Sequence, residues 1–270
     1  MPELPEVETT RRGIEPHIVG KTIKSVVVRQ PSLRWPVSPE LSQVMTGNRV
    51  TGITRRAKYL LFSANSGQMM VHLGMSGSLR ITDQSTALKK HDHIDIVFDD
   101  GTVLRYHDPR RFGSVFWIPE GNSHELIDSL GPEPLSDGFN GHYLYELSRR
   151  RKLAVKLFIM NSKVVVGVGN IYANEALHAS GIRPDRPAGR VSRDRYTRLS
   201  EEIKDVLASA ISSGGTTLRD FVREDGTPGY FKQSLLVYGR GNEPCQGCGR
   251  ALREVRIGNR TTVFCTRCQR

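Results

Sequence analysis

The sequence has little of several residue types, and each shortage excludes a class of protein. Only four cysteines occur in 270 residues, and a chain of this length buries enough core to need no disulfide staples. No uninterrupted apolar run approaches the ~18 residues that a membrane-spanning helix requires. Glutamates occupy the amino terminus, where a secretory signal needs a basic region followed by an apolar one. We therefore expect a cytoplasmic chain of about two domains that does not contact a membrane.

Positive charge, in contrast, is in excess. The 39 lysines and arginines outnumber the 28 aspartates and glutamates, which gives a formal net charge of +11 and a sequence pI near 9.7. Within residues 236–270, seven arginines face two glutamates, so part of the excess is concentrated there. Such a patch is typical of a protein that meets a polyanion, and nucleic acid is the first partner to consider. A basic enzyme without such a partner is the alternative that composition leaves open.

All four cysteines lie in this basic tail as two pairs, Cys245-x2-Cys248 and Cys265-x2-Cys268, with sixteen residues between the pairs. This spacing is typical of two knuckles that close one tetrahedral zinc site. Disulfides are the alternative, but a reducing cytosol and the two-residue gaps favour shared metal ligation. Four thiolates leave no open position for a reacting water, so we expect one structural Zn²⁺ that folds a small finger.

The amino-terminal part of the chain has the pattern of a β-rich domain. Short β-branched or apolar stretches are separated by turns such as Asp99-Asp100-Gly101, which predicts an antiparallel sandwich or barrel over residues 1–118. One helix precedes the strands, over residues 6–13, with glutamates where the helix begins. The predicted strands are 23–28, 49–55, 59–62, 69–72, 78–81, 94–98, 103–106 and 114–117.

After this domain the periodicity changes from two to about 3.6, which indicates helices. We expect a turn-rich linker over 119–134 and a helical domain over 135–222, with Ser192 capping its longest helix, 193–212. The other predicted helices are 143–151, 153–160, 170–180 and 217–222.

The last part of the chain combines a loop and the finger. A polar, glycine-rich stretch predicts a flexible loop and connector over 223–235, and the finger follows over 236–270. Segments 252–257 and 260–264 flank Gly258-Asn259, which predicts a β-hairpin. The expected fold class is therefore α+β and multidomain: an amino-terminal helix with a β-sandwich, a helical domain, and a carboxy-terminal β-hairpin zinc finger.

The residue after Met1 is chemically unusual. If Met1 is removed, as a small second residue generally permits, Pro2 becomes a terminal secondary amine with Glu3 beside it. A free amino terminus has a pKa of about 7.7–8.0, so part of it is an unprotonated nucleophile at neutral pH. Most such starts are only frayed termini, so this feature alone assigns no catalytic role.

Motifs distributed along the whole chain carry a resemblance to a known family. They are PELPEVET at 2–9, Lys58-Tyr-Leu after paired arginines, HLGMSG at 72–77, DPRRFG at 108–113, VGVGNIYA at 166–173, and the terminal finger. In order and spacing they resemble the formamidopyrimidine-DNA glycosylase family from end to end. The related endonuclease VIII branch usually starts with Pro-Glu-Gly-Pro-Glu, so Leu4 favours the purine-lesion branch.

The resemblance implies a bifunctional base-excision repair enzyme. Such an enzyme removes oxidised purines, including 8-oxoguanine and formamidopyrimidines, from double-stranded DNA and cuts the abasic site by β,δ-elimination. The resemblance makes Pro2 the nucleophile that forms an iminium with the sugar, Glu3 the proton donor there, and Lys58 the group that assists β-elimination. Arg260 matches the residue assigned to δ-elimination; because a guanidinium keeps its proton, phosphate binding and leaving-group stabilisation are its easier roles.

The resemblance also implies residues that fill the gap in the DNA. A base inside the stack must be extruded before it reacts, and the space it leaves must be filled. Met75, Arg110 and Phe112 match the filling residues of the family. Their types suit the task, since two are apolar wedges and the third carries a guanidinium that hydrogen-bonds the orphaned base.

Other positions match residues that hold the DNA backbone. Asn170 follows a glycine-rich turn that opens a helix, where backbone N–H groups approach phosphate closely. The surrounding helices resemble the helix-two-turn-helix element of the family. His91, Arg110 and Arg151 match DNA contacts, and Lys156 matches a position near the lesion or its phosphate.

Two other functions stay open. A zinc-ribbon DNA-binding protein without catalysis has no need of Pro2, Glu3 and Lys58 together, which favours the enzyme. The second is an endonuclease VIII-like glycosylase for pyrimidine lesions. A metal site at His91-Asp92-His93 is not expected, because no third ligand is identifiable. We expect a monomer that uses no small-molecule cofactor and works in the cytoplasm with the DNA of the nucleoid.

Overall fold

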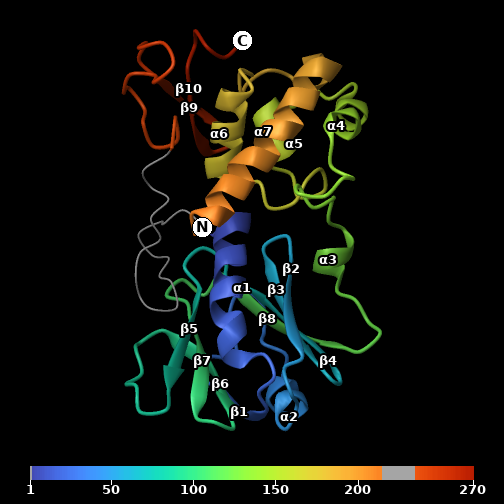
Figure 1. The fold of residues 1–270 in the computed structure, drawn as a ribbon, viewed down its shortest axis with the longest axis vertical. Helices are drawn as coiled ribbons and strands as arrows, with labels where there is room; N and C mark the ends of the chain where they lie inside the picture. Colours follow the sequence, from blue (N-terminus) through green and yellow to red (C-terminus); the bar gives the residue numbers. More distant parts are fainter. Residues whose placement is uncertain (1, 215–234) are drawn as a thin grey trace. The chain divides into compact units, whose positions relative to one another are not determined.

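The computed structural model describes residues 2–214 and 235–270, which divide into two compact units (Figure 1). The first unit comprises the described residues up to 128 and Gly214, and the second comprises 129–213 together with 235–270. The boundary falls inside the segment 119–134 that was expected as a linker, at the end of the short helix α3 (Glu125–Asp128). The helix expected over 217–222 and nearly all of the loop expected over 223–235 lie outside the described residues.

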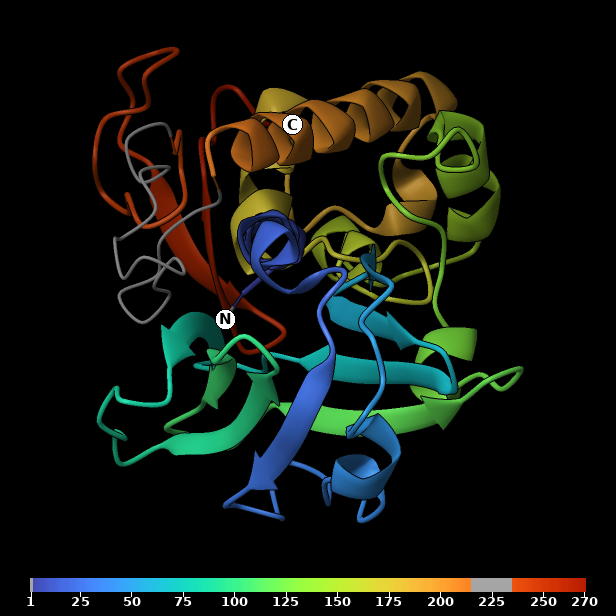
Figure 2. The same ribbon diagram turned by 60° about the horizontal axis from the view of Figure 1, so that its bottom comes forward.

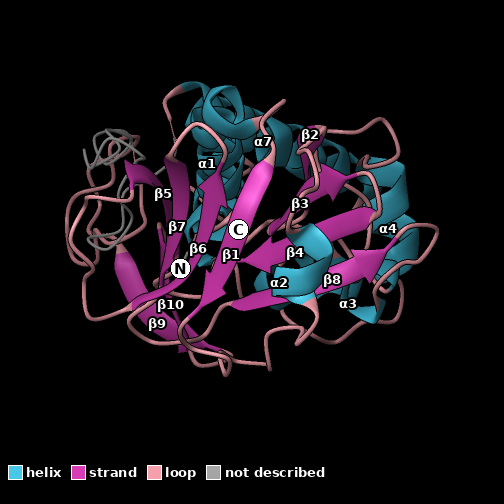
Figure 3. Cartoon of the chain, turned by 90° about the horizontal axis from the view of Figure 1, so that it is seen from below, coloured by secondary structure: helices cyan, strands magenta, loops and turns pink. Residues whose placement is uncertain are grey.

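The strands of the first unit form two antiparallel four-stranded sheets (Figure 3). One sheet has the order β1–β6–β7–β5, with β1 (Ile23–Val28), β6 (Asp92–Phe98), β7 (Thr102–His107) and β5 (Ser78–Asp83). The other has the order β2–β3–β4–β8, with β2 (Gly52–Arg56), β3 (Tyr59–Ala64), β4 (Gly67–His72) and β8 (Ser114–Pro119). Each predicted strand is present, and the two sheets confirm the sandwich.

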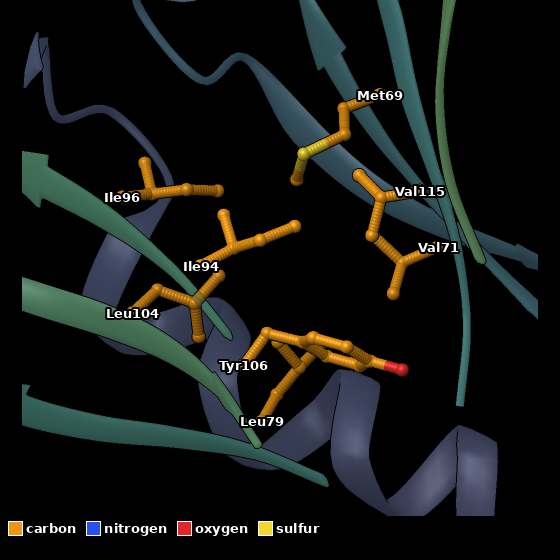
Figure 4. A pocket seen from close by; sticks show the side chains of 8 residues that line it. All are labelled: Met69, Val71, Leu79, Ile94, Ile96, Leu104, Tyr106 and Val115. Carbon is orange, nitrogen blue, oxygen red and sulfur yellow. The ribbon is translucent and has the colours of Figure 1, made fainter. Parts of the chain in front are cut away.

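The core of the sandwich lies between these sheets. Apolar side chains from both sheets surround a small cavity (Figure 4): Met69, Val71 and Val115 from one sheet, and Leu79, Ile94, Ile96, Leu104 and Tyr106 from the other. Residues two apart share a face of a strand, which is why Ile94 and Ile96 line the same space. The ring of Tyr106 packs here, and its hydroxyl donates to Asp108 Oδ2 at 3.1 Å.

Strand β6 begins two residues before the predicted start at Ile94, and it is buried at all seven positions. Its first residue, Asp92, accepts a hydrogen bond from Arg80 Nη2 at 2.7 Å and lies 2.8 Å from His107 Nδ1. Asp95 accepts from Arg105 at 2.9 and 3.0 Å. Asp92 and Asp95 can lie inside the sheet because arginine side chains pair with their carboxylates.

Helix α1 (Leu4–Ile18) contacts strands of both sheets, and Figure 2 views it nearly along its axis. It is longer at both ends than the predicted 6–13. Glu3 precedes the helix as its N-cap, and its backbone N–H donates to Glu6 Oε2 at 2.8 Å. The helix continues past Gly13 because Ile14 and Ile18 pack into the core. The short helix α2 (Leu41–Met45), which was not predicted, packs beside β1.

The second unit holds the remaining helices and the finger. Ser192 caps the longest helix as predicted, since its Oγ accepts from the backbone N–H of Arg195 at 3.4 Å. Among the described residues, no helix has both the length and the apolarity needed to cross a bilayer. The elements are α4 (Gly141–Ser148), α5 (Val155–Ile159), α6 (Asn170–Ala179), η1 (Ala188–Arg190), α7 (Arg193–Ser212), β9 (Arg253–Ile257) and β10 (Arg260–Phe264).

The helices and the finger of this unit are joined by buried hydrogen bonds. Asn174 Oδ1 on α6 accepts from the backbone N–H of Val263 on β10 at 2.8 Å. Its neighbour Glu175 accepts three backbone N–H groups of residues 236–238 at 2.7 to 3.0 Å. Burial raises the pKa of Glu175, although these three donors oppose the rise.

The sandwich, the helices and the hairpin finger together confirm the α+β multidomain fold class.

Candidate active site and nucleic-acid interface

The four cysteines form one cluster in the finger. Their Sγ atoms lie within 4.8 Å of one another, with Cys248 and Cys265 at 3.4 Å and Cys245 and Cys268 at 3.9 Å. Zn–S bonds of ~2.3 Å in a tetrahedron place sulfurs roughly 3.8 Å apart, so this donor set fits one Zn²⁺. The finger binds one structural zinc ion through these side chains, as their spacing predicts.

A histidine from α6 approaches this cluster. His178 Nε2 lies 3.7 Å from Cys245 Sγ, and burial together with the nearby Arg240 lowers the pKa of His178. A neutral imidazole with its proton on Nε2 donates toward a thiolate and stabilises it as a ligand. Nothing in the cysteine spacing points to this residue, because it lies 67 positions from Cys245 in the sequence.

The start of α1 places Pro2 and Glu3 in a buried setting. Pro2 is buried, and Glu3 and Glu6 are only 3% and 1% exposed. The bond from Glu3 N–H to Glu6 Oε2 fixes the backbone at the residue next to Pro2. Glu6 was not among the predicted catalytic residues, and its side chain closes this cap on the backbone of Glu3.

Lys58 lies in the turn between β2 and β3, after Ala57, whose φ is +55°. Helix α1 and strand β2 run antiparallel, because Arg11 Nη1 donates to Ile53 O at 3.3 Å and Arg55 Nε donates to Glu8 Oε2 at 3.2 Å. The beginning of α1 therefore points toward the end of β2 and its turn. Pro2, Glu3 and Lys58, the groups of this unit that were predicted to act on the sugar, therefore lie at the same end of it.

His72, at the end of β4, is affected by the charge of Lys58. Burial, with the charges of Lys58 and Arg34, lowers its pKa to about 4, against a smaller opposing effect of Asp108. Its Nδ1 accepts from the backbone N–H of Gly74 at 3.1 Å, so the neutral ring carries its proton on Nε2. The ring is therefore neutral at the pH at which a terminal amine is a nucleophile. The sequence motif contains His72, but no role was predicted for it.

The three predicted gap-filling residues lie on two turns of the first unit. Met75 occupies the turn before β5 and is half-buried. Phe112, in the turn before β8, is 43% exposed although it is a large apolar residue. The guanidinium of Arg110 lies over the Phe112 ring, 4.8 Å from its centroid. An exposed aromatic ring stacked on a cation is typical of a surface that meets bases.

His91 precedes β6 and is half-buried. Its ring centroid lies 6.1 Å from that of His93 and 6.0 Å from that of His107. His93 Nε2 instead lies 2.8 Å from the carbonyl oxygen of Asp108. Among the described residues the cysteine cluster alone has the geometry of a metal site, so these histidines are a polar cluster beside the turn of Arg110.

Asn170 and Lys156, both predicted to contact DNA, converge on the finger. Asn170 Nδ2 donates to Thr261 O at 3.1 Å. Lys156 is fully buried, and its Nζ donates to Thr261 O at 2.9 Å and to Thr262 Oγ1 at 2.6 Å. These two hydrogen bonds join Lys156 to β10.

Arg260 begins β10, directly after the hairpin turn, and is exposed. The turn residues Gly258 and Asn259 both have positive φ, +55° and +59°, as in a two-residue type I′ turn, and they join the strands of the predicted hairpin. The bonds from Lys156 and Asn170 to Thr261 fix the residue next to Arg260. Arg151, between α4 and α5, is also exposed.

Comparison with known proteins covers all of these features. Residues 1–115 match the formamidopyrimidine-DNA glycosylase N-terminal domain, residues 130–222 match the H2TH domain of the same protein, and residues 242–270 match a zinc finger found in FPG and IleRS. The chain is 60% identical to the formamidopyrimidine-DNA glycosylase of Stutzerimonas stutzeri and 57% identical to that of Pseudomonas aeruginosa. Both alignments cover 100% of each chain.

Solved structures agree with these matches. A complex of Lactococcus lactis Fpg with abasic-site DNA has a TM-score of 0.92 at 32% identity, over 99% of both chains. The MutM (Fpg) protein of Thermus thermophilus has a TM-score of 0.89 at 37% identity, over 99% of this chain and 98% of that one. The chain therefore belongs to the formamidopyrimidine-DNA glycosylase family.

Proposed function

We propose that this chain excises oxidised purines from double-stranded DNA with Pro2 as the nucleophile and then cuts the strand at the abasic site. As a member of this family, it is a base-excision repair glycosylase with abasic-site lyase activity. Relatives of known structure were solved with DNA that contains an abasic site or carbocyclic 8-oxoguanine. The observation that carries our assignment of residues is the buried, capped start of α1 beside Pro2.

The chemistry begins at the amine of Pro2 once Met1 is removed. Its lone pair forms a bond to C1′ of the damaged nucleotide as the bond to the base breaks. The base leaves with the electron pair of that bond and takes up a proton, which balances the proton that the amine nitrogen loses. Glu3 protonates the ring oxygen of the sugar, the ring opens, and a cationic iminium joins Pro2 to C1′. The positive charge acidifies the C2′–H bond. Loss of that proton expels the 3′ phosphate, and a second elimination expels the 5′ phosphate.

Lys58 is proposed to assist the first elimination, and a substitution separates this role from DNA binding. We expect Lys58→Ala to slow β-elimination about tenfold or more, because proton transfer by a positioned group is typically worth ~10²–10⁴-fold. Affinity for an abasic-site analogue changes by less than about threefold, since one cation is one phosphate contact at most. Single-turnover cleavage and equilibrium binding measure the two effects. Lys24→Ala, an exposed lysine on β1, is the control, and equal losses in cleavage and binding by Lys58→Ala contradict the role.

Arg260 is proposed to hold a phosphate of the cut strand. Its guanidinium keeps its proton, so it stabilises the departing phosphate by charge and bidentate hydrogen bonds. Its neighbour Thr261 is fixed by two hydrogen bonds from α5 and α6. A fixed strand gives the exposed guanidinium a defined position.

DNA affinity should depend steeply on salt. The net charge is +11, and we propose that Asn170, Arg151, Arg260 and His91 contact the backbone. If about four to six phosphates are neutralised, a plot of log K against log salt has a slope of roughly −4 to −5. Fluorescence anisotropy of an abasic-analogue duplex from low to moderate salt measures this slope. A flat affinity contradicts the phosphate contacts.

A lesion panel tests the proposed substrate class. We expect single-turnover excision to be fast for 8-oxoguanine and formamidopyrimidine opposite cytosine and at least about tenfold slower for thymine glycol, a difference of ~1.4 kcal/mol in the barrier. The reverse order favours the endonuclease VIII-like alternative. Tight binding without cleavage favours the binding protein without catalysis.

We further propose that the chain acts as a monomer in the cytoplasm, on the DNA of the nucleoid.

A further inference from the structure

One buried carboxylate connects the two turns that carry the gap-filling residues. Asp108 is 0% exposed, and it lies between β7 and Arg110. Its Oδ1 accepts from Ser76 Oγ at 2.7 Å and from the backbone N–H of Arg110 at 3.3 Å. Its Oδ2 accepts from the backbone N–H of Gly113 at 2.9 Å. The carboxylate therefore holds the residue after Met75 with one oxygen and the residue after Phe112 with the other.

A second hydrogen bond closes the connection between the turns. The backbone N–H of Arg110 also donates to Ser76 Oγ at 3.2 Å, so this hydroxyl donates to Asp108 and accepts from Arg110. The fourth donor to the carboxylate is the hydroxyl of Tyr106, which extends from the sandwich core. Burial raises the pKa of Tyr106, with a further rise from Asp108, so the phenol keeps its proton and acts as a donor. The turns are thus anchored to the core through one carboxylate.

The backbones of the two turns also touch. Gly74 has a φ of +66°, and a Cβ on it would clash with the backbone of Phe112 and Gly113. At Gly113 a Cβ would clash with the Tyr106 hydroxyl and the carbonyl of His72. Such close approach leaves the turns little freedom to move separately. A change at Asp108 is therefore transmitted to both turns.

We propose that Asp108 is a positioning residue that sets the geometry of the two gap-filling turns as one body. This inference rests on the proposed function, because it assumes that Met75, Arg110 and Phe112 enter the gap left by the extruded base. Asp108 itself is buried and does not touch DNA. Its effect reaches the DNA through the backbones of Arg110 and Gly113 and through Ser76.

Two variants test the role. Asp108→Asn keeps the size of the side chain but replaces one acceptor oxygen by an NH₂ group, which cannot accept from both turns and Tyr106. Ser76→Ala removes one hydroxyl and with it the hydrogen bonds that join the Met75 turn to Asp108 and to Arg110, and it remains informative if Asp108→Asn is unstable. The matched controls are Asp95→Asn, a buried carboxylate paired with Arg105 and Arg29, and Ser38→Ala, whose hydroxyl accepts from Trp117 N–H at 2.9 Å.

Three readouts separate positioning from general damage to the fold. The first is single-turnover excision of 8-oxoguanine opposite cytosine, and the second is the same reaction opposite a position without a base. The third is borohydride trapping on single-stranded abasic DNA, which has no orphaned base for Arg110 to read. Assays are run below the melting temperature of every variant.

We expect Asp108→Asn to slow excision opposite cytosine by about tenfold or more, the range given by losing buried hydrogen bonds to a charged group. The ratio of the excision rate opposite cytosine to the rate opposite a position without a base, which measures the preference for cytosine, also falls. Borohydride trapping on single-stranded abasic DNA changes by less than about twofold. Ser76→Ala acts in the same direction, by about threefold, and both controls keep the wild-type preference.

Three results overturn the inference. If excision and single-stranded trapping fall together in Asp108→Asn, the residue only supports the fold. If Asp95→Asn loses the preference equally, the effect does not belong to the turns. If the wild type excises and both variants at the turns match it, Asp108 and Ser76 do not position the gap-filling residues. A wild type that does not excise contradicts the proposed function itself, and the inference falls with it.

Discussion

Replacing Pro2 by glycine lowers strand cleavage about a hundredfold or more, as expected when a covalent nucleophile is changed. A secondary amine forms an iminium that is always cationic, whereas a primary amine forms an imine that must be protonated before it acidifies the C2′ proton. Pro2 precedes α1 and its N-cap Glu3, so the change leaves the helix in place. Affinity for an abasic-analogue duplex therefore changes by less than about threefold, since the phosphate contacts remain.

Single-turnover cleavage of a preformed abasic site measures the first effect, and anisotropy measures the second. The control is Pro5→Ala, which alters a proline in the first turn of α1 and leaves the terminal amine unchanged. Mass spectrometry first establishes that each protein begins at residue 2. A loss of affinity as large as the loss of cleavage contradicts a chemical role and makes Pro2 structural.

Removing zinc abolishes DNA binding while the sandwich stays folded. The apolar core of the finger consists of Val237, Leu252 and Val263 with two of the cysteines, too little buried surface to hold a hairpin without metal. Loss of the finger releases Arg260, and it also removes the partners of Lys156 and Asn174. We expect affinity for the abasic-analogue duplex to fall at least about a hundredfold, because several phosphate contacts disappear together.

A metal-sensitive dye follows release of one zinc ion per chain, and circular dichroism follows the strands of the first unit. Re-adding Zn²⁺ restores binding, which separates metal loss from irreversible damage. A matched control is Arg267→Ala, an exposed residue between two ligands of the cluster. Undiminished binding by zinc-free protein contradicts the role of the finger.

Much of the fold follows from local sequence signals. Short β-branched or apolar stretches between turns identify the strands, whose apolar side chains form the core, and the paired cysteine knuckles identify the finger. Ser192 and the Gly258-Asn259 turn are where capping and hairpin chemistry predict them. These features depend on neighbours in the sequence, so a single chain is enough to find them.

Features that depend on partners far apart in the sequence were missed. Strand β6 starts at Asp92 because Arg80 pairs with its carboxylate and His107 Nδ1 lies 2.8 Å from it inside the sheet. Lys156 was predicted to lie near the lesion or its phosphate, and no sequence signal indicated that it would be buried and hydrogen-bonded to β10, 105 positions away. A lysine with backbone and hydroxyl acceptors can be buried, and no local pattern reveals those acceptors.

In the candidate site, too, some features follow from the sequence and others only from the packed structure. The motifs identify Pro2, Glu3 and Lys58, whereas the cap from Glu6 and the neutral state of His72 emerge only from the packed structure. Asp108 lies in the motif that contains Arg110 and Phe112, and only its hydrogen bonds reveal that it joins two turns.

Trapping the covalent intermediate tests the central claim most directly. The purified protein is incubated with an 8-oxoguanine duplex and borohydride, which reduces a transient iminium to a stable amine, and the adduct is mapped by mass spectrometry. The account predicts one adduct, on the nitrogen of Pro2. An adduct on a lysine, or none while tight binding persists and the chain begins at Pro2, contradicts it.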